Sequence, residues 1–250
     1  LNFIFDYSES GRWKKNFAAH DVGTYPLANG QTYQEDMPVE ETGNMLIMTT
    51  AIAIADGNAD YAAKHWETLT IWSNYLAEEG LDPENQLCTE DFAGHLAHNA
   101  NLSAKAIMAI AGYGRLAKML NKPEEAKKYT EMAKKMAIEW ERKANDGDHY
   151  RLAFDRPDTW SQKYNFVWDK TLGMNVLPTE IMKKEVAFYL KNQNKYGLPL
   201  DNRFTWGKTD DTVWSATMAD SEGDFQELIR PIWKYVNETP SRVPLGDWYE

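Results

Sequence analysis

Carboxylates, histidines and tryptophans gather in a few segments of this 250-residue chain that lack helical periodicity. When loops bring acids together, one carboxyl group can be held protonated while another stays ionised, as general acid–base catalysis requires. Such a pair can hydrolyse a glycosidic bond. It can also activate water and protonate the leaving amine in the hydrolysis of an amide. The candidate catalytic residues are Asp21, Glu41, Asp91 and Asp247.

Several acids also have a structural interpretation. Carboxylates near helix starts cap backbone N–H groups and complement the helix dipole. Five acids fall near predicted helix starts: Glu40, Glu41, Asp169, Asp210 and Asp211. The other three catalytic candidates lie in loops beside glycine or aromatic residues, where a turn and a functional site are both open interpretations.

Further residues of the same segments are candidates for binding a substrate. An arginine recognises a carboxylate through paired hydrogen bonds, and aromatic rings suit a sugar or another small organic ligand. These candidates are His20, Tyr25, His95, Arg203, Trp206, Arg242 and Trp248. His95 and His98 would share a face if their segment were helical, but no third ligand accompanies them in a recognised pattern. We therefore predict no metal ion and no other cofactor.

Composition excludes several classes of function. A net charge of −11 without a long basic run argues against nucleic acid or an anionic membrane surface as the partner. The single cysteine, Cys88, rules out an internal disulfide and a cysteine metal cluster. Neither a Gly-x-Ser-x-Gly motif nor a phosphate-binding glycine loop is present. A small-molecule substrate is the expected partner.

The rest of the chain shows helical periodicity, in pairs. Segment 101–120 is apolar around most of its circumference, which predicts a helix buried on both sides. Segment 123–144 begins with Pro123 and is apolar along one stripe only, which predicts an amphipathic helix. Three more pairs repeat the contrast: 38–55 with 59–79, 165–176 with 180–195, and 211–219 with 224–237.

Connection lengths predict how the pairs are arranged. Connections are short within each pair and long between pairs, at about 80–100, 146–164 and 196–210. Short connections make antiparallel hairpins, and repeated hairpins stack. The prediction is an all-α, (α/α)6-type toroid with every long connection at one end. An open solenoid is the alternative, and the burial expected for 101–120 favours a closed ring.

Four hairpins are fewer than the six that usually close such a ring. Residues 1–250 are therefore predicted to be a single toroid domain, incomplete and truncated at both ends. The apolar stretch Leu1–Phe5 looks like part of a strand. Segments 1–37 and 239–250 are expected to be further connections at the same end of the ring.

Six motifs in register make the chain resemble the glutaminase A family of secreted fungal and bacterial proteins. The resemblance covers essentially the whole chain. The motifs are His20–Pro26, Met37–Met45, Thr89–His95, Tyr164–Lys170, Gln193–Asp201 and Glu238–Pro244.

This resemblance implies a toroid of the six-hairpin glycosidase type that follows a β-rich region in a longer protein, with secretion or a periplasmic location. It implies hydrolysis of L-glutamine to L-glutamate and ammonia. A glycoside hydrolase remains an alternative, with Trp160, Trp206 and Trp248 stacking on sugar rings. A non-catalytic carbohydrate-binding or structural helical domain is the third hypothesis.

Overall fold

The structure, a computed structural model, describes residues 1–88, 94–240 and 246–248 and confirms the all-α class. None of the helices in these ranges is both long and apolar enough to cross a membrane. The elements are α1 (Asn2–Glu9), α2 (Pro38–Asp56), α3 (Asp60–Lys64), α4 (Trp66–Glu79), α5 (Ala100–Met119), α6 (Pro123–Ala144), the 3-10 helix η2 (Tyr164–Phe166), α7 (Val167–Thr171), α8 (Glu180–Lys191), β1 (Gly207–Lys208), α9 (Thr209–Thr217), α10 (Glu222–Glu238) and β2 (Asp247–Trp248).

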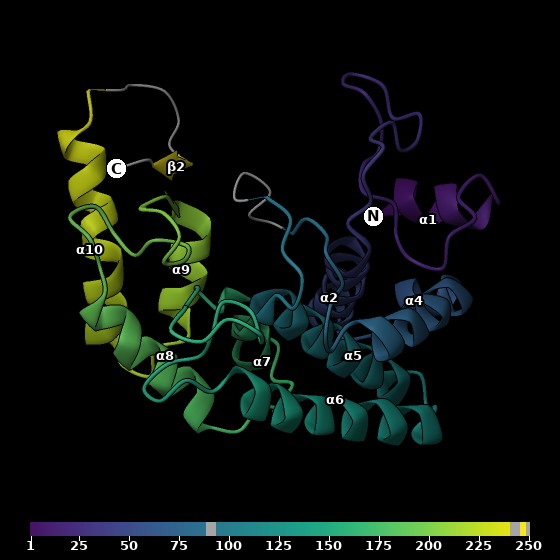
Figure 1. Cartoon of the computed structure of the whole chain (residues 1–250). Coiled ribbons are helices and arrows are strands. Elements are labelled where there is room, and N and C mark those ends of the chain that lie inside the picture. Colours follow the sequence, from purple (N-terminus) through teal and green to yellow (C-terminus); the bar gives the residue numbers. More distant parts are fainter. Residues whose placement is uncertain (89–93, 241–245, 249–250) are drawn as a thin grey trace.

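The helices form an arc of hairpins around a shared interior (Figure 1). The inner row is α2, α5, α7 with η2, and α9, and the outer row is α4, α6, α8 and α10. Within the inner row α5 packs against both α2 and η2, and η2 packs against α9. Residues 100–114 of α5 are buried all round, as the sequence predicts. At the end of the arc α2 is less covered, and Met48 is 45% exposed.

Two glycines determine how closely α2 approaches α5. A Cβ atom added to Gly43 of α2 would lie 2.6 Å from Cγ of Lys105, and one added to Gly112 of α5 would lie 2.6 Å from Oγ1 of Thr50. Both contacts are far shorter than a carbon or oxygen neighbour allows, so only glycine fits at either position. The second contact is seven residues further along both helices. The two helices therefore run in the same direction, with their amino ends at the same end of the arc.

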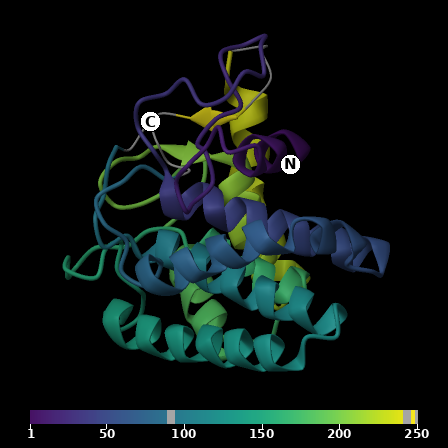
Figure 2. The same ribbon diagram turned by 90° about the vertical axis from the view of Figure 1, so that its right-hand side faces the viewer.

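All the long connections lie on that end, which we call the rim. Figure 2 shows them together on the left of the molecule, with the short turns on the right. Neighbouring connections are bridged by hydrogen bonds, at Asn99 and Ala153 and again at Ser161 and Asp201, and β1 pairs antiparallel with β2. The rim comprises residues 10–37, 80–88, 94–99, 145–163 and 192–208.

A buried ionic network fastens one rim connection to the outer helix α8. The ammonium of Lys163 donates to the carbonyl oxygen of Tyr150 at 3.1 Å and to that of Ser161 at 2.9 Å. Its Nζ lies 3.9 Å from Oε2 of Glu185, and both side chains are almost completely buried. Tyr189 donates its hydroxyl proton to the same carboxylate. Because buried charges require partners, this network fixes the path of 145–163.

Two sequence predictions for the amino-terminal half need correction. The apolar stretch Leu1–Phe5 is not a strand: Leu1 is the N-cap of α1 and residues 2–5 begin the helix, where Phe5 is buried by stacking on the rings of His65 and Trp72. The helix predicted over 59–79 is interrupted at His65, which separates α3 from α4. His65 Nδ1 lies 2.8 Å from Oε1 of Glu9, so this histidine is a packing residue that holds α1.

The helix predicted over 165–176 is also shorter than expected and ends at Thr171. Asp169 in its first turn bends back to accept the backbone N–H of Val176 at 2.9 Å, and Gly173 follows the helix with φ of +62°. Helical periodicity in the apolar residues does not reveal this turn, because buried loops can carry the same residues.

Replacing Lys163 by methionine is expected to destabilise the protein by about 3–5 kcal/mol at pH 8, because Glu185 is left buried without its cation. Burial already raises the pKa of Glu185. The loss is therefore expected to be smaller at pH 5, where the orphaned carboxylate takes up a proton more readily. Urea unfolding at the two pH values measures this. The matched control is Lys183→Met, which breaks an exposed pair with Glu180 and should cost less than about 0.5 kcal/mol. Equal losses in the two variants would contradict the role of the network.

Candidate functional site

A cluster of two acids, an amide and a lysine lies at the rim end of α2 and α5. Glu40 and Glu41 occupy the first turn of α2, and Lys105 of α5 forms a buried ion pair with Glu40. Lys105 also donates to Oδ1 of Asn44 at 2.7 Å. Through its NH2 group, Asn44 reaches Oε1 of Glu40 at 3.4 Å and Oε2 of Glu41 at 3.3 Å. The four side chains form one connected unit.

Within this unit Glu41 has the proton affinity of an acid–base catalyst. Burial raises the pKa of Glu41 from the ordinary value of 4.5 to about 7, and repulsion from Glu40 adds to the increase. The hydrogen bond from Asn44 and the positive charge of Lys105 oppose it. Unlike Glu40, Glu41 is only partly buried. A carboxyl group that titrates near neutral pH and retains access to solvent can both accept and donate a proton.

Asp21 has a different environment in the first rim connection. Its carboxylate accepts the backbone N–H groups of Thr32 and Tyr33, with Oδ2 at 3.1 Å from the nitrogen of Tyr33. The residue therefore organises a loop, which is one of the two roles that the sequence leaves open. Its neighbour His20 contacts the ring of Tyr33 edge-on. The predicted binding residue Tyr25 is 95% exposed at the outside of this loop.

The two rim histidines are not on a shared helical face. His95 and His98 precede α5 in an extended and turn region, and His98 has a positive φ of 59°. His98 Nδ1 lies 2.7 Å from Oδ1 of Asp82, whereas His95 Nε2 lies 3.6 Å from Oε2 of Glu35 in the first rim connection. In the part of the chain that the structure describes, no group of three or more His, Cys, Asp and Glu side chains is arranged to hold a metal ion.

Arginine and tryptophan candidates in connections 145–163 and 192–208 have close neighbours. Arg203 binds the carboxylate of Asp201 with two nitrogens, at 3.0 Å from Nε and 2.6 Å from Nη2. Trp206 stacks on Phe204 with ring centroids 4.0 Å apart. Trp160 contacts Phe188 edge-on and packs against the core. Of these three, Trp206 is the one held in a stacked aromatic pair at the rim.

Other candidates are placed only in part. Asp247 is exposed in β2, where its backbone pairs with Lys208. Its carbonyl oxygen lies 3.5 Å from the hydroxyl of Tyr235. Trp248 belongs to β2 by its backbone, but its side chain lies outside the described residues, as do Asp91 and Arg242 entirely.

The acids expected near helix starts lie there, but none of them is the N-cap residue. The N-cap positions of α2, α7 and α9 are Met37, Phe166 and Lys208. Glu40, Glu41, Asp169, Asp210 and Asp211 instead lie in the first turns that follow. There they complement the helix dipole, so the structural interpretation accounts for their position without excluding chemistry at Glu41.

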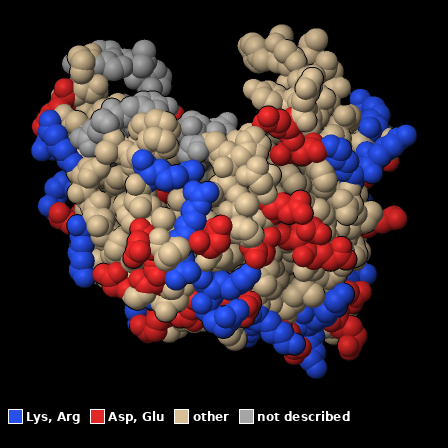
Figure 3. Space-filling model, viewed as in Figure 1, with Lys and Arg blue, Asp and Glu red and all other residues tan. Residues whose placement is uncertain are grey.

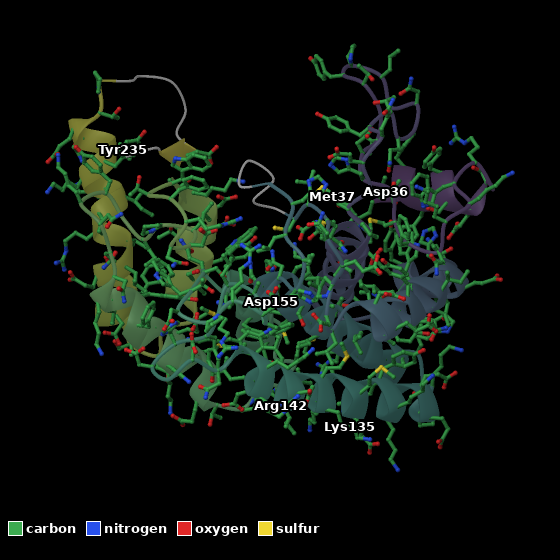
Figure 4. All side chains as sticks on the ribbon, in the orientation of Figure 1. Asp36, Met37, Lys135, Arg142, Asp155 and Tyr235 are labelled. Atoms are coloured by element: carbon green, nitrogen blue, oxygen red, sulfur yellow. The ribbon has the colours of Figure 1, made fainter. Side chains whose placement is uncertain are left out.

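The face seen in Figure 3 has a gap at its top edge, between the projecting first connection and the carboxyl-terminal part of the chain. Side chains on this face are seen in Figure 4, where Lys135 and Arg142 of α6 mark the outer edge of the arc. A separate cavity of about 430 Å³, lined by Arg115 and Lys118 near the carboxyl end of α5, lies at the end opposite the rim. Neither Glu40 nor Glu41 is among the residues that line this cavity.

An arc of helical hairpins with its long connections on one rim defines the class of protein: an all-α hairpin-array domain. Comparison with known proteins specifies the family. The chain matches the glutaminase A six helical-hairpin domain over residues 1–250 and belongs to that family. It is 34% identical over 257 residues to Glutaminase A of Aspergillus oryzae, covering 100% of this chain and 37% of that protein.

A second relative is a protein of Arthroderma benhamiae named as a probable glutaminase. It is 26% identical over 338 residues, covering 100% of this chain and 39% of the relative. The chain therefore spans less than two fifths of the length of either relative.

Neither Lys105 nor Lys163 was among the candidate residues. Lys105 stands among mainly apolar residues in a buried helix, whereas Lys163 is buried but lies in the polar stretch 161–165. An isolated cation at such a position signals a buried acidic partner, because an unpaired buried charge is too costly. That signal leads to Glu40 only once the packing of α5 on α2 is known.

The raised pKa of Glu41 predicts how stability depends on pH. The folded state binds this proton more tightly than the unfolded state, so the contribution is fully present below pH 4.5 and is lost as the pH rises through about 7. Relative to Glu41→Gln, the wild type should lose about 1–3 kcal/mol of unfolding free energy between pH 5 and pH 8. Urea unfolding of both proteins at each pH tests this, and parallel curves would contradict the shift.

Proposed function

We propose that this chain is the helical part of a glutaminase that hydrolyses L-glutamine to L-glutamate and ammonia. Family membership and the names of the two relatives support this activity. One residue links this activity to a site. Glu41 is a partly exposed carboxyl group whose pKa is raised to about 7, and it lies at the rim end of the inner helices.

In the proposed reaction the ionised Glu41 takes a proton from water as the water oxygen attacks the side-chain carbonyl carbon of glutamine. A new C–O bond forms and the carbonyl oxygen becomes negatively charged. The proton held by Glu41 then passes to the amide nitrogen, the C–N bond breaks and ammonia leaves. The new side-chain carboxylic acid then gives its proton to the released ammonia, so the products are glutamate and ammonium. Glu41 ends ionised, and protons and charge balance. A pKa near the working pH suits a group that must both accept and return a proton.

Part of the proposed site rests on residues outside the described ranges. Asp91 remains our second acid–base candidate, and Arg242 remains our candidate for binding the α-carboxylate of glutamine. Arg203 is a weaker candidate for that role, because the carboxylate of Asp201 already holds it. Asp21 lies within the rim and Asp247 in β2, and we assign neither of them a proton transfer in this scheme.

A glycoside hydrolase is the second candidate function. The stacked pair of Phe204 and Trp206 favours it, because an aromatic surface at the rim suits the apolar face of a sugar ring. Phe204 is 48% exposed, so this surface is accessible. Hydrolysis of an oligosaccharide would use the same carboxylates as glutamine hydrolysis, so only a comparison of substrates separates the two functions.

We further propose that the protein acts with a β-rich amino-terminal domain and is secreted or periplasmic. The resemblance to the glutaminase A family supports both statements, and the greater length of the two relatives is consistent with an additional domain. Fractionation of the cells that produce the protein tests the location. Recovery in the cytoplasmic fraction alone would contradict it.

Replacing Glu41 by glutamine is expected to lower kcat for ammonia release from L-glutamine by about 10²–10⁴-fold, because the amide cannot accept the proton of water. The assay uses the full-length protein and runs beside a panel of oligosaccharides. In the wild type, kcat should rise with an apparent pKa of about 7, since the ionised form of Glu41 is the active one.

Glu139→Gln is the matched control, because this glutamate lies on the exposed face of α6 and pairs with Arg142. It should retain wild-type activity. Sugar release without ammonia release would favour the glycoside hydrolase. Full glutaminase activity in Glu41→Gln would remove Glu41 from the mechanism.

A further inference from the structure

The side chain of Lys105 crosses α2 at Gly43, a residue that has no side chain of its own. Residues 100–114 of α5 are all buried, and Lys105 is the only cation in that range. A Cβ atom at Gly43 would lie 2.6 Å from Cγ and 3.0 Å from Cδ of Lys105. The aliphatic stem therefore lies directly on the backbone of α2, and the absence of a side chain at Gly43 leaves it the necessary space.

The position of the stem determines what the ammonium contacts. Glu40 and Asn44 are one helical turn apart and flank Gly43, so an ammonium that emerges there reaches both, as observed. A lysine only donates hydrogen bonds, so it must face the oxygen of the Asn44 amide. The NH2 group of Asn44 is thereby turned toward Glu41, and it donates to Oε2 at 3.3 Å.

We infer that Lys105 is a positioning residue for Glu41: seated against Gly43, it fixes the amide of Asn44 and the carboxylate of Glu40, and these two groups fix Glu41. The inference deepens the proposed function and rests on it for the role of Glu41 in catalysis. The charged groups that face Glu41 from the described residues are Glu40 of the same helix and Lys105 of the helix packed against it. Lys105 does not contact the substrate in this scheme.

The first test is Lys105→Met in the full-length protein, which keeps most of the stem and removes the charge. Both Lys105 and the Asn44 hydrogen bond lower the proton affinity of Glu41. The acidic limb of the kcat profile for glutamine should therefore move upward by about one pH unit. We also expect kcat at its optimum to fall about tenfold with KM little changed, because Glu41 loses its orientation. Lys118→Met, an exposed lysine further along α5, is the control and should change neither.

The second test is Gly43→Ala, which retains every charge and pushes the Lys105 stem away. Alanine is the better helix former, so propensity alone would raise the melting temperature. We expect the melting temperature to fall instead, and the acidic limb to move in the same direction as in Lys105→Met. This variant keeps the inference testable if Lys105→Met, in which buried Glu40 loses its ammonium partner, does not fold.

A readout that does not depend on activity separates the inference from the proposed function. The melting temperature is measured against pH with and without Glu41→Gln, in the wild-type and Lys105→Met backgrounds. The pH at which Glu41 affects melting should be higher in the Lys105→Met background. If it is, but Glu41→Gln keeps full activity, the coupling stands and the catalytic proposal fails. If Glu41→Gln abolishes activity while Lys105→Met and Gly43→Ala match the Lys118→Met control, the inference is overturned and the proposed function remains.

Discussion

Helices α2 and α5 are in close contact at two glycines. Gly43 of α2 lies against Lys105, and Gly112 of α5 lies against Thr50. These contacts make the helices parallel and close, and they bring both amino ends to the rim. Much of the candidate chemistry depends on that arrangement, because Glu40 and Glu41 begin one helix and their counter-charge comes from the other. If the two helices packed less closely, the Lys105 side chain would not be held against Gly43 between them.

Two buried lysine–glutamate pairs, each in or beside the rim, serve different purposes. Lys163 and Glu185 are both almost fully buried and attach a connection to an outer helix. Lys105 and Glu40 lie beside a partly exposed acid. Desolvation makes each pair costly, so neither is efficient as a source of stability alone. What they supply is a defined arrangement of side chains, which in the second pair extends to Glu41.

Periodicity predicted the hairpins well, because an amphipathic or buried helix leaves a regular pattern of apolar residues. The start and end of α6 were predicted at the residues where they occur. The break at His65 and the early end of α7 were not predicted. Both depend on tertiary contacts, a ring stacked on Phe5 in one case and the carboxylate of Asp169 in the other.

The candidate site was predictable only to the level of a rim. The sequence made both Glu41, near a helix start, and Asp21, in a loop, catalytic candidates. The structure gives the first a raised pKa and the second a pair of backbone N–H partners. That difference comes from what surrounds each carboxylate and not from its neighbours in sequence. Burial and Glu40 raise the pKa of Glu41, and Lys105, which opposes the increase, is 64 residues from Glu41 in the chain.

Bridges between successive connections have a consequence for how this domain tolerates change. Asn99 pairs with Ala153, Ser161 with Asp201, and β1 with β2 through backbone bridges. Each of these connections is therefore held by its neighbour. Surface loops without such bridges accept insertions independently of one another. A change in one of these bridged loops also strains the loop that is paired with it. Changes at the rim should therefore accumulate in coordinated sets of neighbouring loops, while the outward faces of α6 and α8 diverge freely.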